Sequence, residues 1–226
     1  MAQIEVESAL IEPESLKEFC YQLLLQANLT EHDAGLVADT LVESNLRGID
    51  SHGVARLPHY LERIRQQSIQ PRPEMQWEPL GDAVGRVDGD HGLGQLAMVK
   101  AADHAVELAR DSGAGWVSIC NSSHCGALAY YGLRIAEAGM IGFAFTHVDP
   151  MVTPHGAAEP FCGTNPICMT APGKEGKSLC LDMATSITPW NTIANAATEG
   201  VSIPGDWALD ANGRGTTDPN EVVALF

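Results

Sequence analysis

A short segment between residues 47 and 60 holds the side chains best suited to binding and protonating a small anion. It contains two arginines, two histidines, a serine and a tyrosine. Arg56 could hold a carboxylate through two parallel hydrogen bonds, and His52 could transfer a proton near neutral pH. Ser51 and Tyr60 add hydroxyl groups. The segment therefore predicts the substrate end of an active site.

Helical spacing brings part of this segment onto one face. Residues 54–66 have the pattern of a helix, with Pro58 in the first turn, where the missing N–H costs least. On this helix Arg56, Tyr60 and Arg63 stand at i, i+4 and i+7. The alternative interpretation is that Arg56 and Arg63 are ordinary charged residues on the surface.

A second histidine follows a predicted strand over residues 115–120. The turn at 121–126 contains His124 and precedes a predicted helix over 126–138. Open α/β sheets bind ligands at this position, beyond the carboxyl end of a strand. His124 is therefore a second candidate for proton transfer or for the wall of a cofactor site, and the alternative is a histidine that only caps the helix.

Two further clusters of short polar side chains lie in the second half of the chain. Residues 163–166 form a Gly-Thr-Asn-Pro turn, and an acid with two hydroxyl residues follows the predicted strand at 178–181. Their backbone amides and hydroxyl groups could line a dinucleotide site, although turn formation explains the same residues.

Gly92, Gly94 and Ala97 match a degenerate dinucleotide-binding fingerprint after a predicted strand. That fingerprint needs an acidic residue about 20 positions further on to bind the ribose, and the strand at 115–120 ends without one. Asp88 and Asp90 would also place negative charge beside the pyrophosphate. We therefore do not interpret these glycines as a phosphate loop.

The elements around these segments alternate in type. Two amphipathic helices precede the substrate segment, and strands alternate with helices after it. The predicted elements are helices at 13–25, 30–46, 93–112 and 189–198, strands at 83–88, 140–146 and 178–181, a strand closing on a tight turn at 207–214, an extended connector at 69–79, and a loop-rich stretch after 146. The pattern predicts an α/β fold with an N-terminal helical layer, divided into a helical region at 1–80 and a cofactor-binding region at 81–226.

The composition excludes several classes of partner. Thirteen Lys and Arg against 29 Asp and Glu give a net charge of -16 over 226 residues, which opposes binding to nucleic acids and to anionic membranes. The start of the chain has neither a basic nor an apolar leader pattern, and no run approaches the roughly 18 apolar residues of a membrane span. We expect a cytoplasmic protein.

The cysteines and histidines show no metal-binding spacing. The six cysteines contain no C-x-x-C pair, and the eight histidines contain no H-E-x-x-H motif. We expect reduced, buried thiols and no metal. Cys125 follows His124 directly, and a reactive thiol there is the alternative to a packing role.

Several motifs occur together over nearly the whole chain. They are Ser51-His52-Gly53 with Arg56, Ser123-His124-Cys125-Gly126, Asp149-Pro150-Met151-Val152-Thr153-Pro154, Gly163-Thr164-Asn165-Pro166, Asp182-Met183-Ala184-Thr185-Ser186, Trp207-Ala208-Leu209-Asp210 and Thr216-Thr217-Asp218-Pro219. In this order the set closely resembles the malate/L-lactate dehydrogenase family typified by ureidoglycolate dehydrogenase. The resemblance implies a non-Rossmann fold with a mixed sheet, NAD or NADP as cofactor, a small carboxylate substrate and a homodimer.

The resemblance also implies roles for individual residues. His52 or His124 would transfer the proton, with Ser51, Arg56 and Tyr60 around the substrate. The residues implied to contact or line the cofactor site are Thr164, Asn165, Pro166, Asp182, Met183, Ala184 and Thr185. We therefore expect hydride transfer between nicotinamide and a small 2-hydroxy or 2-oxo acid of the malate, lactate or ureidoglycolate type.

Three departures leave alternatives open. Asn191 and Thr192 stand where many members have a Gly-Lys pair, so the choice between NAD and NADP is open, and Val148 stands where serine is frequent. Members of the family also continue beyond the position of Phe226 into a glycine-rich segment that helps close the cofactor site. The rival hypothesis is a truncated, catalytically silent dimeric binding protein of the same fold.

Overall fold

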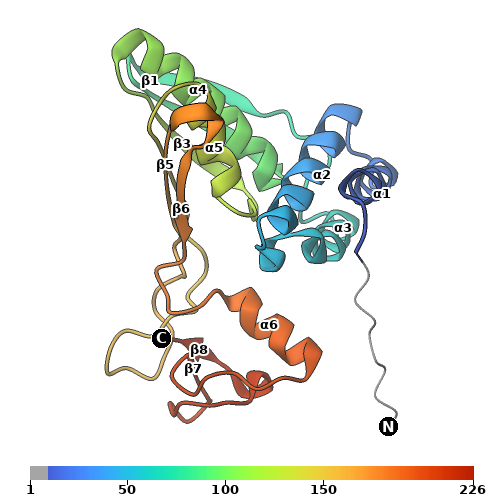
Figure 1. Cartoon of the computed structure of the whole chain (residues 1–226), viewed down its shortest axis with the longest axis vertical. Helices are drawn as coiled ribbons and strands as arrows, with labels where there is room; N and C mark the ends of the chain where they lie inside the picture. Colours follow the sequence, from blue (N-terminus) through green and yellow to red (C-terminus); the bar gives the residue numbers. More distant parts are fainter. Residues whose placement is uncertain (1–9) are drawn as a thin grey trace.

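The computed structural model describes residues 10–226, and it begins with three helices packed together (Figure 1). These are α1 (Pro13–Gln26), α2 (Glu31–Leu46) and α3 (Leu57–Arg65). Thr30 caps α2, because its side chain accepts a hydrogen bond of 3.1 Å from the Asp33 amide. The three helices bury one apolar core that includes Leu24, Leu41 and Tyr60.

A three-stranded mixed sheet follows the helices. It contains β1 (Gln76–Gly81), β2 (Val84–Gly92) and β3 (Trp116–Ser122), with β1 antiparallel and β3 parallel to β2. The long helix α4 (Gly94–Ser112) makes the crossover between the parallel strands. Leu93 and Leu96, at the start of α4, complete the core of the N-terminal helices. The N-terminal helices of the predicted helical layer therefore share one core with α4, which lies on the other side of the predicted division at residue 80.

A second sheet of three antiparallel strands lies against α5 (Ala129–Glu137). The strands are β4 (Gly142–Phe145), β5 (Ile167–Ala171) and β6 (Leu179–Met183), in that order. Gly132 of α5 lies directly on this sheet, because a Cβ atom at Gly132 would stand 2.7 Å from Thr170 Cγ2. The Thr170 hydroxyl donates to the Gly132 carbonyl oxygen at 2.6 Å. The absence of a side chain at Gly132 is what allows helix and sheet to meet.

The other face of the second sheet is exposed and apolar. Seven side chains share this face, which we call the open apolar face: Phe143, Phe145, Ile167, Met169, Leu179, Leu181 and Met183. Strand alternation explains the set, since their neighbours in sequence point toward α5. Exposed apolar patches of this kind mark surfaces that another element covers.

The chain ends in a small third unit, drawn below the second sheet in Figure 1. It consists of α6 (Trp190–Glu199), β7 (Ala208–Leu209) and β8 (Ala224–Leu225) around a core that includes Ile193 and Ile203.

Four sequence predictions need correction. The connector predicted at 69–79 becomes strand β1 from Gln76, where an edge strand tolerates Pro79. The stretch predicted as loop after 146 contains β5, whose five residues are stabilised by pairing with β4 and β6. In the segment at 207–214 the predicted turn is present, because the Asp210 carboxylate accepts from the amides of Asn212 and Arg214, but the strand is only the two residues of β7.

The fourth correction concerns the thiols. All six cysteines are free, but Cys162 is exposed, whereas Cys20, Cys125 and Cys168 are buried as expected. Burial raises the pKa of the Cys125 thiol to about 12. A thiolate at Cys125 is therefore disfavoured, and the packing interpretation of this residue is the better one.

The predicted α/β class, with a mixed sheet and an N-terminal helical layer, is confirmed. The division at about residue 80 stays a prediction. Across residues 10–226, no helix has the length and apolar character needed to cross a membrane.

We expect Leu24→Ala to destabilise the protein by about 2–5 kcal/mol, the range for truncating a fully buried leucine. Leu46→Ala, at a position that is 62% exposed, is the matched control and should change the free energy of unfolding by less than about 0.5 kcal/mol. Urea denaturation measures both, and equal effects would contradict the assignment of the core.

Candidate active site

Asn45 at the end of α2 folds the substrate segment into position. Its Oδ1 atom accepts a 2.8 Å hydrogen bond from the Val54 amide, and its Nδ2 atom donates to the Asp50 carboxylate. A Cβ atom at Gly53 would stand 2.2 Å from Asn45 Oδ1, so this contact requires glycine. Two short 3₁₀ turns, Asp50–His52 and Val54–Arg56, result from this arrangement. The second of them replaces the first turn of the helix predicted at 54–66, and α3 begins at Leu57.

The structure brings His52, His124 and Tyr60 together. The Tyr60 hydroxyl lies 2.7 Å from His124 Nδ1, and the two imidazole rings stack with centroids 5.5 Å apart and an interplanar angle of 22°. Ser51 Oγ lies 2.9 Å from His52 Nδ1. These residues come from positions 51 to 124, so the cluster joins the N-terminal helices to the loop after β3.

The loop that carries His124 is held from three sides. Gly94 lets the start of α4 approach it, because a Cβ atom there would stand 2.2 Å from the Ser123 carbonyl oxygen. The Tyr131 hydroxyl donates to the Cys125 carbonyl oxygen. The Asp182 carboxylate accepts a 2.7 Å hydrogen bond from the Ala129 amide at the start of α5. The loop is therefore rigidly placed by residues from α4, α5 and β6.

Burial determines the charge state of the two histidines. It lowers the pKa of His124 to about 3, with smaller contributions from the charges of His52, His59, Arg56 and Arg63. The pKa of His52 is lowered by burial and then by Arg56. Both rings are therefore neutral at pH 7 in the protein without substrate.

Arg56 lies beside this cluster, and one of its N–H groups has no hydrogen-bond partner among the described residues. Its Nη1 atom donates to Asn191 Oδ1 at 3.0 Å, and Asn191 Nδ2 donates to the Ser51 carbonyl oxygen at 3.2 Å. Arg56 Nε is buried and has no hydrogen-bond partner within residues 10–226. An unpaired buried guanidinium N–H is costly, so the site is suited to an anionic group that accepts from it.

Sequence reasoning missed the contribution of Asn191. This residue drew notice only because it departs from a Gly-Lys pair, yet its carboxamide connects Arg56 to Ser51. The two partners are 135 and 140 residues away in sequence. No local pattern could have indicated such a contact.

The predicted cofactor residues lie on β6 and in the turns next to it. Thr185 donates to the Thr164 carbonyl oxygen from both its amide, at 2.8 Å, and its hydroxyl, at 2.9 Å. Met183 is 53% exposed on the open apolar face. The Asp182 side chain lies on the opposite face, where it caps α5. Burial raises the pKa of Asp182, although the Ala129 amide counteracts this.

The other predicted members lie in the same region. Asn165 has a positive φ of 32° and accepts a 3.3 Å hydrogen bond from the Val148 amide. The Pro166 carbonyl oxygen accepts from the Thr146 amide at 3.4 Å, and Ala184 separates Met183 from Thr185. These residues form a connected turn at the start of β5 and the end of β6.

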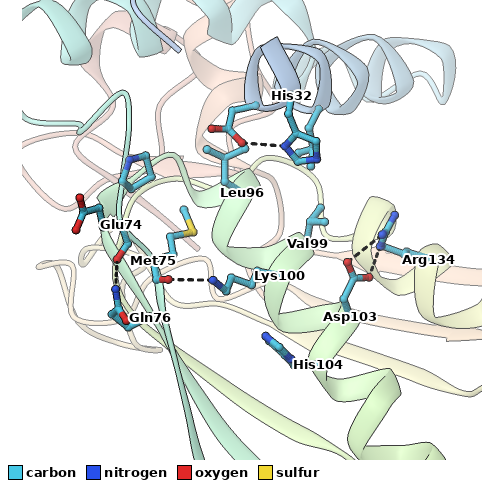
Figure 2. Close-up of a pocket in the computed structure, with 13 residues that line it drawn as sticks. His32, Glu74, Met75, Gln76, Leu96, Val99, Lys100, Asp103, His104 and Arg134 are labelled. Carbon is cyan, nitrogen blue, oxygen red and sulfur yellow. Dashed lines mark hydrogen bonds and ion pairs between the residues drawn. The ribbon is translucent and has the colours of Figure 1, made fainter. Parts of the chain in front are cut away.

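A separate hollow of about 860 Å³ lies between α2, β1, α4 and α5 (Figure 2). It contains none of the predicted site residues. Figure 2 shows two of its charged side chains in hydrogen bonds, since Arg134 binds the Asp103 carboxylate and Lys100 donates to the Met75 carbonyl oxygen at 2.9 Å. Among the described residues, no group of three or more metal-ligating side chains is present.

The lowered pKa of His124 predicts a specific dependence of stability on pH. The unfolded chain, with a histidine pKa near 6.5, binds a proton that the folded chain does not bind until about pH 3. Stability therefore falls as pH drops through this window, by at most about 1.4 kcal/mol per pH unit for this group. We expect His124→Gln to reduce the loss of unfolding free energy between pH 7 and pH 5.

Urea denaturation at the two pH values measures this slope. His32→Gln is the control, since the His32 side chain is 82% exposed, and this variant should keep the wild-type slope. A His124→Gln slope equal to that of the wild type would show that His124 is not held neutral by burial.

Comparison with known proteins supports one family. The model of the malate/L-lactate dehydrogenase family matches residues 11–225. Ureidoglycolate dehydrogenase (NAD(+)) of Escherichia coli is 39% identical over 216 residues, which are 96% of this chain and 62% of that protein. Malate dehydrogenase of Pyrococcus abyssi is 41% identical over 212 residues, covering 94% of this chain and 58% of its own length.

A solved structure agrees with this assignment. The crystal structure of malate dehydrogenase from Entamoeba histolytica superimposes with a TM-score of 0.91 at 32% identity, covering 95% of this chain and 60% of that one. The chain thus spans about three fifths of the length of these relatives. Sequence and fold together show that the chain belongs to the malate/L-lactate dehydrogenase family.

Proposed function

We propose that the protein is an NAD(P)-dependent oxidoreductase that transfers hydride between nicotinamide and a small 2-hydroxy or 2-oxo acid. The observation that carries this proposal is the unpaired, buried Nε atom of Arg56 beside the His52–His124 pair. A carboxylate would satisfy the arginine, and a carbonyl or hydroxyl oxygen next to it would lie within reach of an imidazole. A 2-hydroxy acid has these two groups on adjacent carbons.

The chain's own residues take three roles in this proposal. Arg56, held by Asn191, orients the carboxylate. His52 or His124 exchanges the proton with the substrate oxygen, and histidine suits this role near neutral pH. Ser51 and Tyr60 hold the two rings through hydrogen bonds of 2.9 and 2.7 Å.

The turn at the ends of β5 and β6 fits a nicotinamide cofactor. Met183 offers an exposed apolar surface to an aromatic ring, and the backbone beside it is fixed by Thr185 and Thr164. When bound, the cofactor would supply the hydride acceptor and donor. In this proposal Asp182 acts through α5 and the His124 loop, which its carboxylate anchors, rather than by direct contact. NAD is the first candidate because the Escherichia coli relatives are named for it, and NADP is the second.

The substrate belongs to the class that the relatives' names share. Those names cover ureidoglycolate, malate and sulfolactate, all small acids with a hydroxyl group on the carbon next to a carboxylate. A cytoplasmic location is part of the proposal, supported by six free cysteines, one of them exposed.

Replacing either histidine tests the activity. We expect alanine at the acid–base position, His52 or His124, to lower kcat by about 10²-fold or more, and alanine at the other to have a smaller effect. His32→Ala is the control and should leave kcat unchanged. The measurement is NADH-linked turnover with a panel of 2-hydroxy and 2-oxo acids, and full activity in both variants would refute the assignment.

The rival proposal is a catalytically silent binding protein of the same fold. The observation that favours it is the length of the chain, about three fifths of the relatives' length. NADH fluorescence enhancement on titration, without turnover of any acid in the panel, would support this rival. Turnover that depends on His52 or His124 would exclude it.

We also propose that the protein is a homodimer and that the open apolar face contributes to the interface. Apart from Met183, which this proposal leaves to the cofactor, that face presents six apolar side chains and no charge, as the core of an obligate interface does. It is also continuous across three adjacent strands. A second copy is therefore the occupant to which this proposal commits.

We expect light scattering after gel filtration to show a dimer, and Phe143→Asp to convert it to a monomer at micromolar concentration because a charge would be buried in the interface. Trp116→Asp is the control, since Trp116 is 60% exposed on β3 and outside this face. A monomeric wild-type protein would refute the proposal. It would indicate that another part of the same protein chain covers this face.

A further inference from the structure

Gln95 is a fully buried polar residue that the proposed mechanism does not use. It lies in the first turn of α4 and is 0% exposed. Neither Nε2 nor Oε1 has a hydrogen-bond partner of ordinary length within residues 10–226. An unpaired buried carboxamide is costly, so its retention requires a reason.

The Gln95 carboxamide lies against the loop that carries His124. A Cβ atom at Gly126 would stand 3.9 Å from Gln95 Nε2, and Gly126 is two residues from His124. Burial, followed by Cys125, raises the pKa of Tyr60, and the neighbouring Gln95 carboxamide opposes this by stabilising the phenolate oxygen. The Gln95 carboxamide therefore adjoins Gly126, whose amide shares His124 Nδ1 with the Tyr60 hydroxyl.

The hydrogen bonds around His124 identify its tautomer. The Gly126 amide, which can only donate, lies 3.3 Å from His124 Nδ1. Nδ1 must therefore be an acceptor and carry no proton. The Tyr60 hydroxyl, 2.7 Å from the same atom, then donates to it as well. Because the ring is neutral, its single proton is on Nε2.

This arrangement leaves the oxygen of Tyr60 in need of a donor. Its proton is directed to His124, and the adjacent buried donor is the Gln95 carboxamide. We propose that Gln95 is a positioning residue: its Nε2 donates to Tyr60, Tyr60 donates to His124 Nδ1, and His124 is held as the tautomer that presents Nε2–H to the substrate oxygen. Catalytic hydrogen bonds that are long without substrate often shorten in the complex.

A consequence concerns the oxo acid. A carbonyl oxygen can only accept hydrogen bonds, so a site that presents Nε2–H is complementary to a 2-oxo acid. This consequence rests on the proposed function, whereas the tautomer itself does not. The two can therefore be tested separately.

Nuclear magnetic resonance of ¹⁵N-labelled histidine tests the tautomer without any turnover. At pH 7 we expect the wild-type protein to show His124 protonated at Nε2. Gln95→Met should increase the population protonated at Nδ1, because Tyr60 loses its donor and can turn its own oxygen toward the ring, while only the longer 3.3 Å contact from the Gly126 amide still opposes a proton on Nδ1. Wild-type protein protonated at Nδ1, or an unchanged tautomer in Gln95→Met, would overturn the proposal.

Kinetics in a double-mutant cycle test the route of the effect. We expect Gln95→Met to lower kcat/KM for reduction of a 2-oxo acid by roughly three- to tenfold, the value of one hydrogen bond. In a Tyr60→Phe background the same change should have less than a twofold effect, because the hydroxyl group is already absent. Additive effects of the two substitutions would overturn the proposal.

Stability separates this role from simple packing. Methionine has nearly the volume of glutamine and no unpaired polar atoms, so Gln95→Met should leave the unfolding midpoint unchanged or raise it while activity falls. Gln22→Met, on the exposed surface of α1, is the control for both readouts. Full activity of the Gln95→Met protein would show that Gln95 has only a packing role. If His124 shows the expected tautomer but the protein turns over none of the acids, the role of Gln95 is supported and the proposed function is refuted.

Discussion

Burial of a neutral imidazole against a tyrosine hydroxyl is the interaction on which the site depends. Tyr60 and His124 lie 64 residues apart in sequence, and their 2.7 Å contact joins α3 to the loop after β3. The cost of burying two polar side chains is offset only while each satisfies the other. Helices, strands and loops around the cluster therefore have to hold this one contact in place.

The fold meets this requirement through polar groups that act on backbone atoms. Asn45 orients the substrate segment, and Asp182 fixes the start of α5 and, through it, the His124 loop. Asn191 connects Arg56 to Ser51. Each of these carboxylates or carboxamides binds other groups of the protein, so each acts as a structural support of the site.

The glycines at 92 and 94 show how a motif can have a packing cause. Their spacing matches a dinucleotide fingerprint, yet a side chain at Gly94 would collide with the backbone of residues 123–125. The next residue in α4, Gln95, is buried with its carboxamide beside Gly126 of the same loop. The pattern that suggests a phosphate loop is therefore explained by close contact between the start of a helix and the His124 loop.

Local patterns alone determined a large part of this description. Periodicity predicted α1, α2 and α4 nearly to their ends, because each of these helices buries one face, and Thr30 caps α2. The types of residue at 51, 52, 56, 60 and 124 also indicated acid–base and carboxylate-binding chemistry before any geometry was known. Residue type limits what a side chain can do, wherever it lies.

Only the tertiary structure decided which of these residues meet. It stacked His52 on His124, turned Asp182 toward α5, and brought Asn191 to Arg56. It also formed β5, a short strand bounded by prolines at 166 and 172 that exists through pairing with β4 and β6. These features depend on contacts between residues far apart in sequence, and local patterns do not encode such contacts.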